Sequence, residues 1–555
     1  MPSHQDKPPD KIEVQPVTSN EDSNSNPDLL SKPRSGPLAF LRPSHSHTAA
    51  SATILLTLSA LLSRVMGLVR DQYIAYKFGA GHSTDAYNVA FYLPEWISYL
   101  LIGGAASITF VTILDRYRAA NDEAEGERAL SIILNTMVFV LGGAILLAEI
   151  FTPLFTRIYF DPNSPEGLLC THITRIILPA QLFFFAGGVL ASVLLVRKQF
   201  SLQAIAPLLY NFGIILGGVL LANRMGISAL GVGALAGAFA GPFLLNAYGA
   251  YRAGLRYRFI LDLKHPGLRE WVRLSLPLML GVTIITLDSQ ILGYFAKHGA
   301  GDISRLNYAK RLFTAPMAII GQAAGAASLP FFASLFGRKQ FDAFAAAVNR
   351  SVSRLIAFSL LGSAGMIALA HPAVDLIFRH GSFTSADGNA TAVYFGIFAL
   401  SLALWTAQAI YARAFYAAGE TFVPMVAGTI ITVITLPIYW GLHQRFGVIG
   451  LAWASNIAIL IHTLTLAILL HRRNLVRLSG LEQPELARAF LAALLSGGAV
   501  TLLLHLVPHL LPHDATYKTD LVTLIAGGAV WMGVAYATLI LTGSKLPQQM
   551  RARRG

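Results

Sequence analysis

The chain has 555 residues, of which 54% are hydrophobic and only 13% are charged, and its mean hydropathy is +0.56. So apolar a sequence has too few polar residues to cover one soluble domain of this size, which excludes a single soluble core. The net charge of +13 does not indicate nucleic-acid binding, because most of the 42 Lys and Arg residues fall in loops that the topology below places on the cytoplasmic side. We therefore expect no nucleic-acid partner.

Residues 1–47 are rich in Pro, Ser, Asn and Asp and show no apolar periodicity, which predicts a disordered tail. A short apolar segment after a basic start is missing there, so we do not expect a cleavable signal peptide. Because the number of predicted crossings is even and the basic loops lie inside, both termini are expected in the cytoplasm.

Apolar stretches long enough for a helix to cross a bilayer follow from about residue 48 onward, and we count fourteen. They predict an all-α polytopic membrane protein. The expected spans are 48–77, 84–114, 129–153, 168–196, 203–223, 228–251, 271–297, 306–336, 347–371, 388–417, 422–441, 447–471, 486–507 and 519–543.

An internal repeat organises these spans. FGAGHSTD at 78–85 corresponds to HGAGDISR at 298–305, and GAASITF at 104–110 corresponds to GAASLPF at 325–331. Six crossings separate the copies, so the repeat is parallel and predicts two pseudo-symmetric six-helix lobes. We expect a first lobe at 48–251, a basic cytoplasmic linker at 252–270, a second lobe at 271–471, and two further helices with a basic tail at 472–555.

Charged residues inside the first two spans are candidate functional residues, because charge is costly in the bilayer core. Arg64 and Asp71 are seven residues apart and share one helix face, and Arg70 lies on the same span. Two interpretations stay open at this point. The arginines form ion pairs with Asp85 or Glu95 on the second span, or they line a cavity that receives an anionic substrate.

The second lobe contributes its own cations. In the register of the repeat, Lys310 and Arg311 in NYAKRLF correspond to the region around Ala90 and Phe91. A cavity with cations on both walls is typical of a secondary transporter for an anionic substrate.

Three stretches name a family. SRVMGLVRDQYIAYKFGAGHSTDAYNVAFYLPEWI, beginning at residue 63, resembles the opening of the MurJ (MviN) family of lipid II flippases. LIFRHGSFTSAD at 376–387 and YARAFYAAGETFVP at 411–424 are similar to later segments of that family. The family belongs to the multidrug/oligosaccharidyl-lipid/polysaccharide (MOP) exporter superfamily.

The resemblance implies an alternating-access protein of the bacterial cytoplasmic (inner) membrane that moves the undecaprenyl-diphosphate-linked peptidoglycan precursor to the outer leaflet for cell-wall synthesis. It also implies that Arg64, Arg70, Asp85 and Arg311 line a central substrate cavity, to which we add Lys310, and that the last two helices help to form a groove for the lipid tail. Asp71, Glu95 and Asp288 are candidates for gating or ion coupling.

This sequence departs from the family pattern at several cavity positions. Ser98 and Tyr99 stand where family members carry basic residues, and Gly103 stands where they carry an acid. Lys310 and Thr314 likewise replace acids. A flippase for another polyprenyl-linked oligosaccharide, such as an O-antigen or exopolysaccharide unit, therefore stays open as an alternative, and a multidrug antiporter is a weaker one.

We expect no enzyme activity, because translocation of a lipid breaks no bond, and no cofactor. We also expect no metal site, because no Cys/His cluster has the spacing of metal ligands. The lone cysteine, Cys170, excludes an intrachain disulfide. Sodium or proton coupling stays open without a clear site, since the span at 422–441 has no acid. The expected partners are the lipid-linked glycan and the bilayer, and the expected functional unit is a monomer.

Overall fold

The structure is a computed structural model that describes residues 49–98, 105–279, 284–506 and 517–551. The predicted tail at 1–47, Tyr99 and Gly103 lie outside these residues, so the expectations for them stay predictions. Throughout the described ranges every regular element is a helix.

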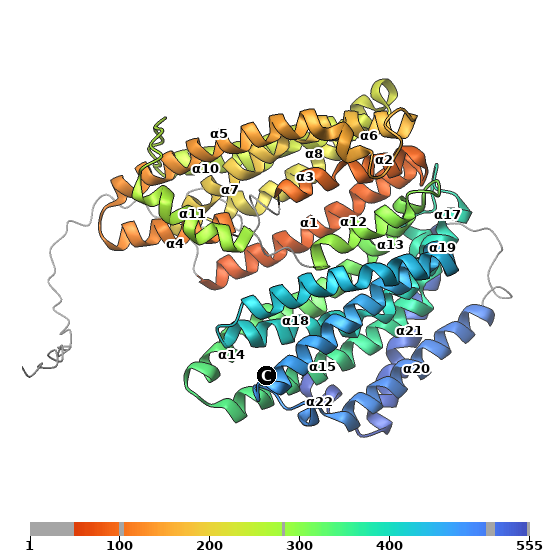
Figure 1. The fold of residues 1–555 in the computed structure, drawn as a ribbon. Coiled ribbons are helices and arrows are strands. Elements are labelled where there is room, and N and C mark those ends of the chain that lie inside the picture. The colour runs from red at the N-terminus through yellow and green to blue at the C-terminus, as the bar shows by residue number, and fades with distance from the viewer. Residues whose placement is uncertain (1–48, 99–104, 280–283, 507–516, 552–555) are drawn as a thin grey trace, which may run out of the picture.

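The first group of helices, which we call the first bundle, includes three helices of 25 residues or more and several shorter ones in series (Figure 1). Its elements are α1 (Ala49–Phe78), α2 (His82–Ala90), α3 (Tyr92–Ile97), α4 (Ala105–Ala119), α5 (Glu123–Thr156), α6 (Pro165–Ile177), α7 (Ala180–Val196), α8 (Ser201–Met225), α9 (Ser228–Ala238), a π-helical segment (Phe239–Leu245), α10 (Asn246–Arg252) and α11 (Pro266–Met279).

The remaining helices form the second bundle. They are α12 (Ile284–Ala296), α13 (Asp302–Met317), a π-helical segment (Ala318–Gln322), α14 (Ala323–Gly337), α15 (Phe341–Ala368), α16 (Ala370–Phe378), α17 (Ser385–Leu400), α18 (Leu402–Ala417), α19 (Phe422–Arg472), a 3₁₀ turn (Leu478–Gly480), α20 (Gln483–Leu506), α21 (Tyr517–Leu541) and α22 (Leu546–Arg551).

The predicted spans fall on these helices or on consecutive runs of them, and the all-α polytopic class is confirmed. Within the described residues, eight helical stretches are long and apolar enough to cross a membrane, and the pair α17 and α18, bent by 43°, makes a ninth. One of the eight, α19, holds two predicted spans, because Gly447 has a φ of +60° and breaks the helix between them. Other spans, such as those on α1 and α2–α4, carry charged residues or are divided into short helices.

The two bundles converge at one end. Figure 1 shows their ribbons converging near α2, α13 and α17 and separating towards α4, α11 and α14. We call these the closed end and the open end. At the closed end α2 and α1 contact α13, and α1 also contacts α16. Buried residues there, including Ala86, Ala90, Leu306 and Ala309, form one continuous apolar core across both bundles.

Helix α11 packs against the first bundle, although the sequence analysis assigns residues from 271 onward to the second lobe. It contacts α4 and α5 of the first bundle, and its Trp271, with 1% of its surface exposed, lies 5.5 Å from Phe110 and 6.3 Å from Phe185 between ring centres. Helix α12, in contrast, contacts α13 and α19. By packing, the second bundle therefore begins at α12 and not at residue 271, because burial of the Trp271 ring holds α11 on the first bundle.

Candidate functional site

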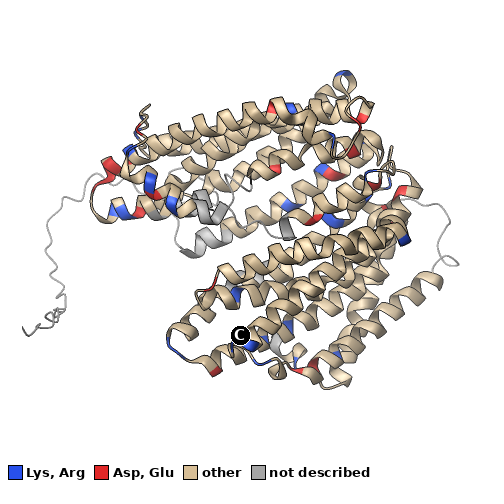
Figure 2. Cartoon of the chain, in the orientation of Figure 1, with Lys and Arg blue, Asp and Glu red and all other residues tan. Residues whose placement is uncertain are grey.

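A cavity of about 640 Å³ lies between the bundles, within the range of pockets that hold drug-sized ligands. Its wall carries four cations and two carboxylates. Figure 2 shows charged residues at the ends of the bundles and also between them, beside α1 and α13. The charged lining residues are Arg64, Arg70, Asp71, Glu95, Lys310 and Arg311.

Asp71 is the charged centre of this cavity. Its Oδ1 atom accepts hydrogen bonds from Arg70 Nε at 3.0 Å and Arg70 Nη2 at 2.9 Å. The same oxygen accepts a hydrogen bond from Nη1 of Arg311, which comes from α13 in the second bundle. Only 3% of the Asp71 surface is exposed. One buried carboxylate thus holds two guanidinium groups from different bundles, the arrangement that charged groups need away from water.

Arg70 is further fixed by Asn211 of α8, whose Oδ1 accepts a hydrogen bond from Arg70 Nη1 at 2.9 Å. The alternative in which Arg70 pairs with Asp85 or Glu95 is therefore wrong, because its neighbour Asp71 is within reach and the carboxylate of Asp85 is used elsewhere. Arg64 lies on the cavity wall one to two turns towards the open end, and its side chain is exposed. The cavity interpretation of the first-span charges fits this geometry.

Glu95, on α3, also lines this cavity. Its Oε2 atom accepts a hydrogen bond from Gln290 Nε2 of α12 at 3.5 Å. Trp96 Nε1 donates to the Oε1 atom of the same Gln290. This amide therefore links the two bundles beside the cavity, and Glu95 faces the space without an arginine bound to it through any described ion pair.

Lys310 lines the cavity, but its ammonium turns away from it. Nζ contacts Oδ2 of Asp288 on α12, a residue 2% exposed that is not part of the cavity wall. The Asp288 carboxylate also accepts hydrogen bonds from the Tyr439 hydroxyl and, at 3.0 Å, from Ser455 Oγ, both on α19. Lys310 and Asp288 thus form a second buried ion pair, inside the second bundle.

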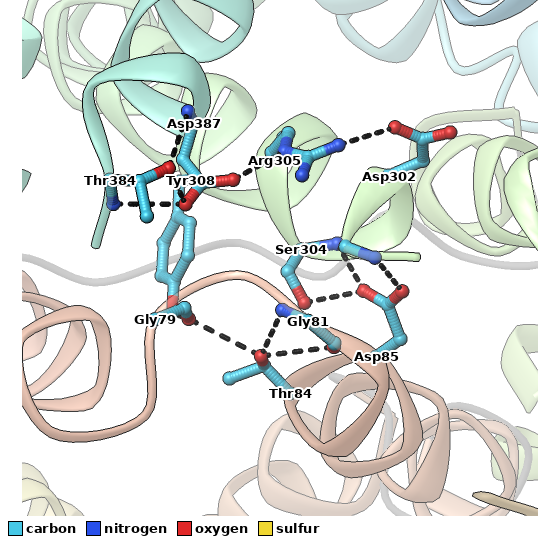
Figure 3. Close-up of polar contacts among 11 residues, drawn as sticks. Gly79, Gly81, Thr84, Asp85, Asp302, Ser304, Arg305, Tyr308, Thr384 and Asp387 are labelled. Atoms are coloured by element: carbon cyan, nitrogen blue, oxygen red, sulfur yellow. Dashed lines mark hydrogen bonds and ion pairs between the residues drawn. The ribbon is translucent and has the colours of Figure 1, made fainter. Parts of the chain in front are cut away.

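Asp85 lies at the closed end, where Figure 3 shows its carboxylate facing Ser304. Its Oδ2 accepts a hydrogen bond from the Gly301 backbone N–H at 2.6 Å. Its Oδ1 accepts two more, from the Ser304 N–H at 2.8 Å and from Ser304 Oγ at 2.6 Å. These donors begin α13, so a carboxylate of the first bundle binds the N-terminus of a helix in the second. We call Asp85, Gly301 and Ser304 the latch.

The two GAG segments of the repeat meet at this latch, and glycine is required there. Gly79 and Gly301 have φ values of +69° and +81°, which other residues rarely adopt. A Cβ atom added at Gly301 would overlap the carbonyl oxygen of Ala80, and one added at Gly79 would lie 2.5 Å from the carbonyl oxygen of Ser382. One glycine from each GAG segment thus brings backbone against backbone across the bundles.

Further contacts support the closed end. The Tyr308 hydroxyl donates to the Gly79 carbonyl at 3.2 Å, and the Ser382 N–H donates to the Tyr76 carbonyl at 2.8 Å. Arg305 is held by Asp387 and Asp302 through hydrogen bonds of 2.8 and 2.9 Å (Figure 3). Sequence reasoning missed these residues. The repeat offered a signal, since Arg305 stands at the position that corresponds to Asp85.

Within the described ranges, no group of three or more His, Cys, Asp or Glu side chains is placed to hold a metal ion. Of the charged residues on the cavity wall, Arg70 and Arg311 pair with Asp71, and Lys310 pairs with Asp288 outside the wall. Such a site can bind and neutralise an anion, because guanidinium groups form paired hydrogen bonds with phosphate oxygens and stay charged when they are partly desolvated.

Comparison with known proteins places the chain in a family. Residues 74–516 match the family model described as lipid II flippase MurJ. A probable lipid II flippase MurJ from Vibrio cholerae is 25% identical over 517 residues, covering 89% of this chain and 96% of that protein. The lipid II flippase MurJ of Thermosipho africanus is 26% identical over 418 residues, covering 75% of this chain and 84% of that protein.

Solved structures show the same fold. A lipid II flippase MurJ in an inward closed conformation superposes with a TM-score of 0.71 at 22% identity, covering 88% of this chain and all of that one. An inward-facing multidrug resistance MATE transporter of the MOP superfamily superposes with a TM-score of 0.61 at 13% identity, covering 76% of this chain and 98% of that one. Together with the family model, which matches most of the sequence, these comparisons show that the chain is a multi-pass membrane protein of the lipid II flippase MurJ family.

Proposed function

We propose that this chain carries lipid II from the inner to the outer leaflet of the cytoplasmic membrane, for peptidoglycan synthesis. The observation that carries the proposal is the cavity whose arginines come from both bundles and which the latch shuts at the closed end. Family membership supports the substrate, and the excess of cations supports binding of its diphosphate.

In this mechanism the open end faces the cytoplasm, as does each terminus. The diphosphate and sugar headgroup enters the cavity while the prenyl tail stays in lipid. Arg64, Arg70 and Arg311 bind the diphosphate. The diphosphate therefore competes with Asp71 for the guanidinium groups of Arg70 and Arg311, which Asp71 holds in the structure. Release of Arg311 from Asp71 removes the central link between the bundles.

Translocation then requires the latch at Asp85 to open while the bundles close at the other end. The headgroup leaves towards the outer leaflet, and the lobes rock back. Because no covalent bond is made or broken, this is transport and not enzymatic catalysis. The membrane potential or an ion gradient biases the direction, and one chain holds the complete cavity, so we propose that it acts as a monomer without nucleic acid or cofactor.

The decisive experiment is replacement of the native flippase. In cells depleted of that flippase, expression of this chain should restore lipid II to the outer leaflet, where an externally added enzyme that hydrolyses lipid II can reach it. If lipid II stays in the inner leaflet while the chain is well expressed and inserted, the substrate assignment is wrong. Mass spectrometry of lipids that copurify with the protein would identify the glycan directly.

The second candidate is a flippase for another polyprenyl-linked oligosaccharide. It is favoured by the replacement of basic residues near the end of α3, where Ser98 stands. Copurified O-antigen or exopolysaccharide units in place of lipid II would establish it. A multidrug antiporter shares the fold, but four cations on the cavity wall disfavour cationic drugs.

A further inference from the structure

The Lys310 ammonium has two potential anionic partners. One is the carboxylate of Asp288, and the other is an anionic substrate in the cavity. Its side chain lines the cavity, so the ammonium can reach a bound anion by rotation of its flexible stem. In the structure the ammonium instead contacts Asp288 of α12, and only 12% of the Lys310 side chain is exposed. The cavity therefore has one cation that is turned away from it.

The Asp288 carboxylate links four segments of the second bundle, because side chains from three of them donate hydrogen bonds to it. The carboxylate belongs to α12, the ammonium to α13, and the hydroxyl donors Tyr439 and Ser455 lie on either side of the break at Gly447 in α19. Whatever removes the ammonium leaves a buried carboxylate with hydroxyl donors alone. Such a carboxylate has to find new partners, so its packing against α13 and α19 must change.

We propose that Lys310 is a substrate-responsive switch: the diphosphate competes with Asp288 for the Lys310 ammonium, and the transfer loosens the junction of α12, α13 and α19. The inference rests on the proposed function, since it takes a diphosphate as the anion in the cavity. It gives Lys310 a role distinct from that of the arginines. Arg70 and Arg311 are held by the cavity carboxylate Asp71, whereas Lys310 carries the signal of occupancy into the second bundle.

Charge balance supports this assignment. Excluding Lys310, the wall has three cations against the carboxylates of Asp71 and Glu95, a net charge of +1. A diphosphate brings at least two negative charges, so a further cation is needed to neutralise it in a partly desolvated space. Lys310 forms its described ion pair with Asp288, a carboxylate that is not itself part of the wall, so transfer of its ammonium adds a cation to the cavity.

The test is a double-mutant cycle on the purified full-length chain, with inorganic pyrophosphate as the probe and calorimetry as the readout. Lys310→Gln should weaken pyrophosphate binding roughly tenfold, because one charge-assisted hydrogen bond is lost. Asp288→Asn should strengthen it by a similar factor, because the lysine is released. In the double variant the Asp288→Asn effect should vanish, leaving the affinity of Lys310→Gln.

The cycle separates a switch from general electrostatics. Removing any nearby negative charge raises anion affinity, but that gain would persist when Lys310 is Gln. An equal gain from Asp288→Asn in both backgrounds, or no pyrophosphate binding in any of the four proteins, overturns the proposal. Lys77→Gln removes an exposed cation outside the cavity wall and should leave the affinity unchanged.

A second measurement follows the lysine itself. The rate of Lys310 acetylation by acetic anhydride, read by mass spectrometry against Lys77, should rise in Asp288→Asn and fall again on addition of pyrophosphate. An unchanged rate contradicts the model. If Asp288→Asn does not fold, Tyr439→Phe replaces it: the carboxylate then has one donor fewer, holds the ammonium more tightly and should weaken pyrophosphate binding.

Failure of the proposed function has a different signature. In that case the pyrophosphate cycle holds, but the wild-type chain does not restore lipid II to the outer leaflet of depleted cells. The switch is wrong when lipid II is restored and the cycle shows no dependence of the Asp288 effect on Lys310.

Discussion

Asp71 and Arg311 belong to different bundles and are 240 residues apart, yet the Arg311 guanidinium donates a hydrogen bond to the Asp71 carboxylate in the middle of the cavity. The contact links the bundles and, in the proposed mechanism, is also part of the anion site. In that mechanism a bound anion that draws Arg311 away also weakens the link, so that substrate binding and movement of the bundles would involve the same two side chains.

The first prediction concerns this arginine. Arg311→Ala should lower the flipping rate of lipid II in proteoliposomes at least tenfold, because the diphosphate loses a paired, charge-assisted contact and Asp71 loses its partner in the second bundle. Arg64→Ala should lower it as well. Arg252→Ala, which removes an exposed cation at the end of α10, is the matched control and should leave the rate unchanged. Unaltered transport in both cavity variants would refute the cationic cavity.

The second prediction concerns the latch. Asp85→Asn keeps the size of the side chain but loses the charge that attracts the donors of Gly301 and Ser304. The closed end should therefore open more often. A cysteine placed at Asn307 on the cavity wall reports this through its reaction with a membrane-impermeant maleimide added outside, and the native Cys170 does not interfere because it is buried.

We expect the external labelling rate to rise roughly tenfold in Asp85→Asn, in line with the loss of charge-assisted hydrogen bonds. Asp161→Asn provides the control, since that carboxylate accepts only from a neighbouring residue in its own loop among its described contacts. Labelling that is equally slow in all three proteins would mean that Asp85 does not hold the closed end shut.

The third prediction separates backbone strain from steric overlap. Gly301→Ala forces alanine into a left-handed conformation, at a cost of about 1–2 kcal/mol, and also pushes the new methyl group into the Ala80 carbonyl of the other bundle. Gly419→Ala has the same strain at a φ of +79°, but its methyl group meets no atom within 4 Å. Both should lower thermal stability slightly. Only Gly301→Ala should raise external labelling of the cysteine at position 307, and equal labelling in the two variants would argue against steric closure.

The fourth prediction concerns sodium. The oxygens of Asp288 already accept hydrogen bonds from Lys310, Tyr439 and Ser455, so this carboxylate has little capacity left to bind an inorganic cation. Replacing sodium by potassium on both sides of the membrane should leave the flipping rate unchanged, whereas collapse of the membrane potential should lower it. A rate that falls when sodium alone is removed would contradict this prediction. It would mean either that a sodium site lies elsewhere in the chain or that sodium displaces Lys310 from Asp288.

The sequence was sufficient to find the cavity cations. Arg64, Arg70 and Arg311 interrupt apolar spans, and a charge in such a place needs a polar space or a partner. It could not assign partners, because a hydrogen bond such as that between Arg311 and Asp71 depends on how helices from two bundles are placed, and helical periodicity gives only the face of one helix. For the same reason the pairing of Lys310 with Asp288 was not foreseen.

The division into bundles was predictable in outline and inexact at its boundary. Apolar length and the GAG repeat indicate two related halves, but they treat residues 271–297 as one span of the second half. Trp271 reverses this for α11, since its ring is buried among aromatic residues of the first bundle. Packing of one large side chain is invisible to a count of apolar residues.

The latch has an asymmetry that bears on its evolution. Two of the three hydrogen bonds that Asp85 accepts come from backbone amides, which are present whatever the side chain. Drift in the second bundle can therefore change side chains around the latch without losing these donors, provided that glycine is kept at position 301. The first bundle has no such freedom, because its contribution is a single carboxylate. A saturation screen for loss of function should accordingly find a sharp intolerance at Asp85 and, facing it, an intolerance confined largely to one glycine.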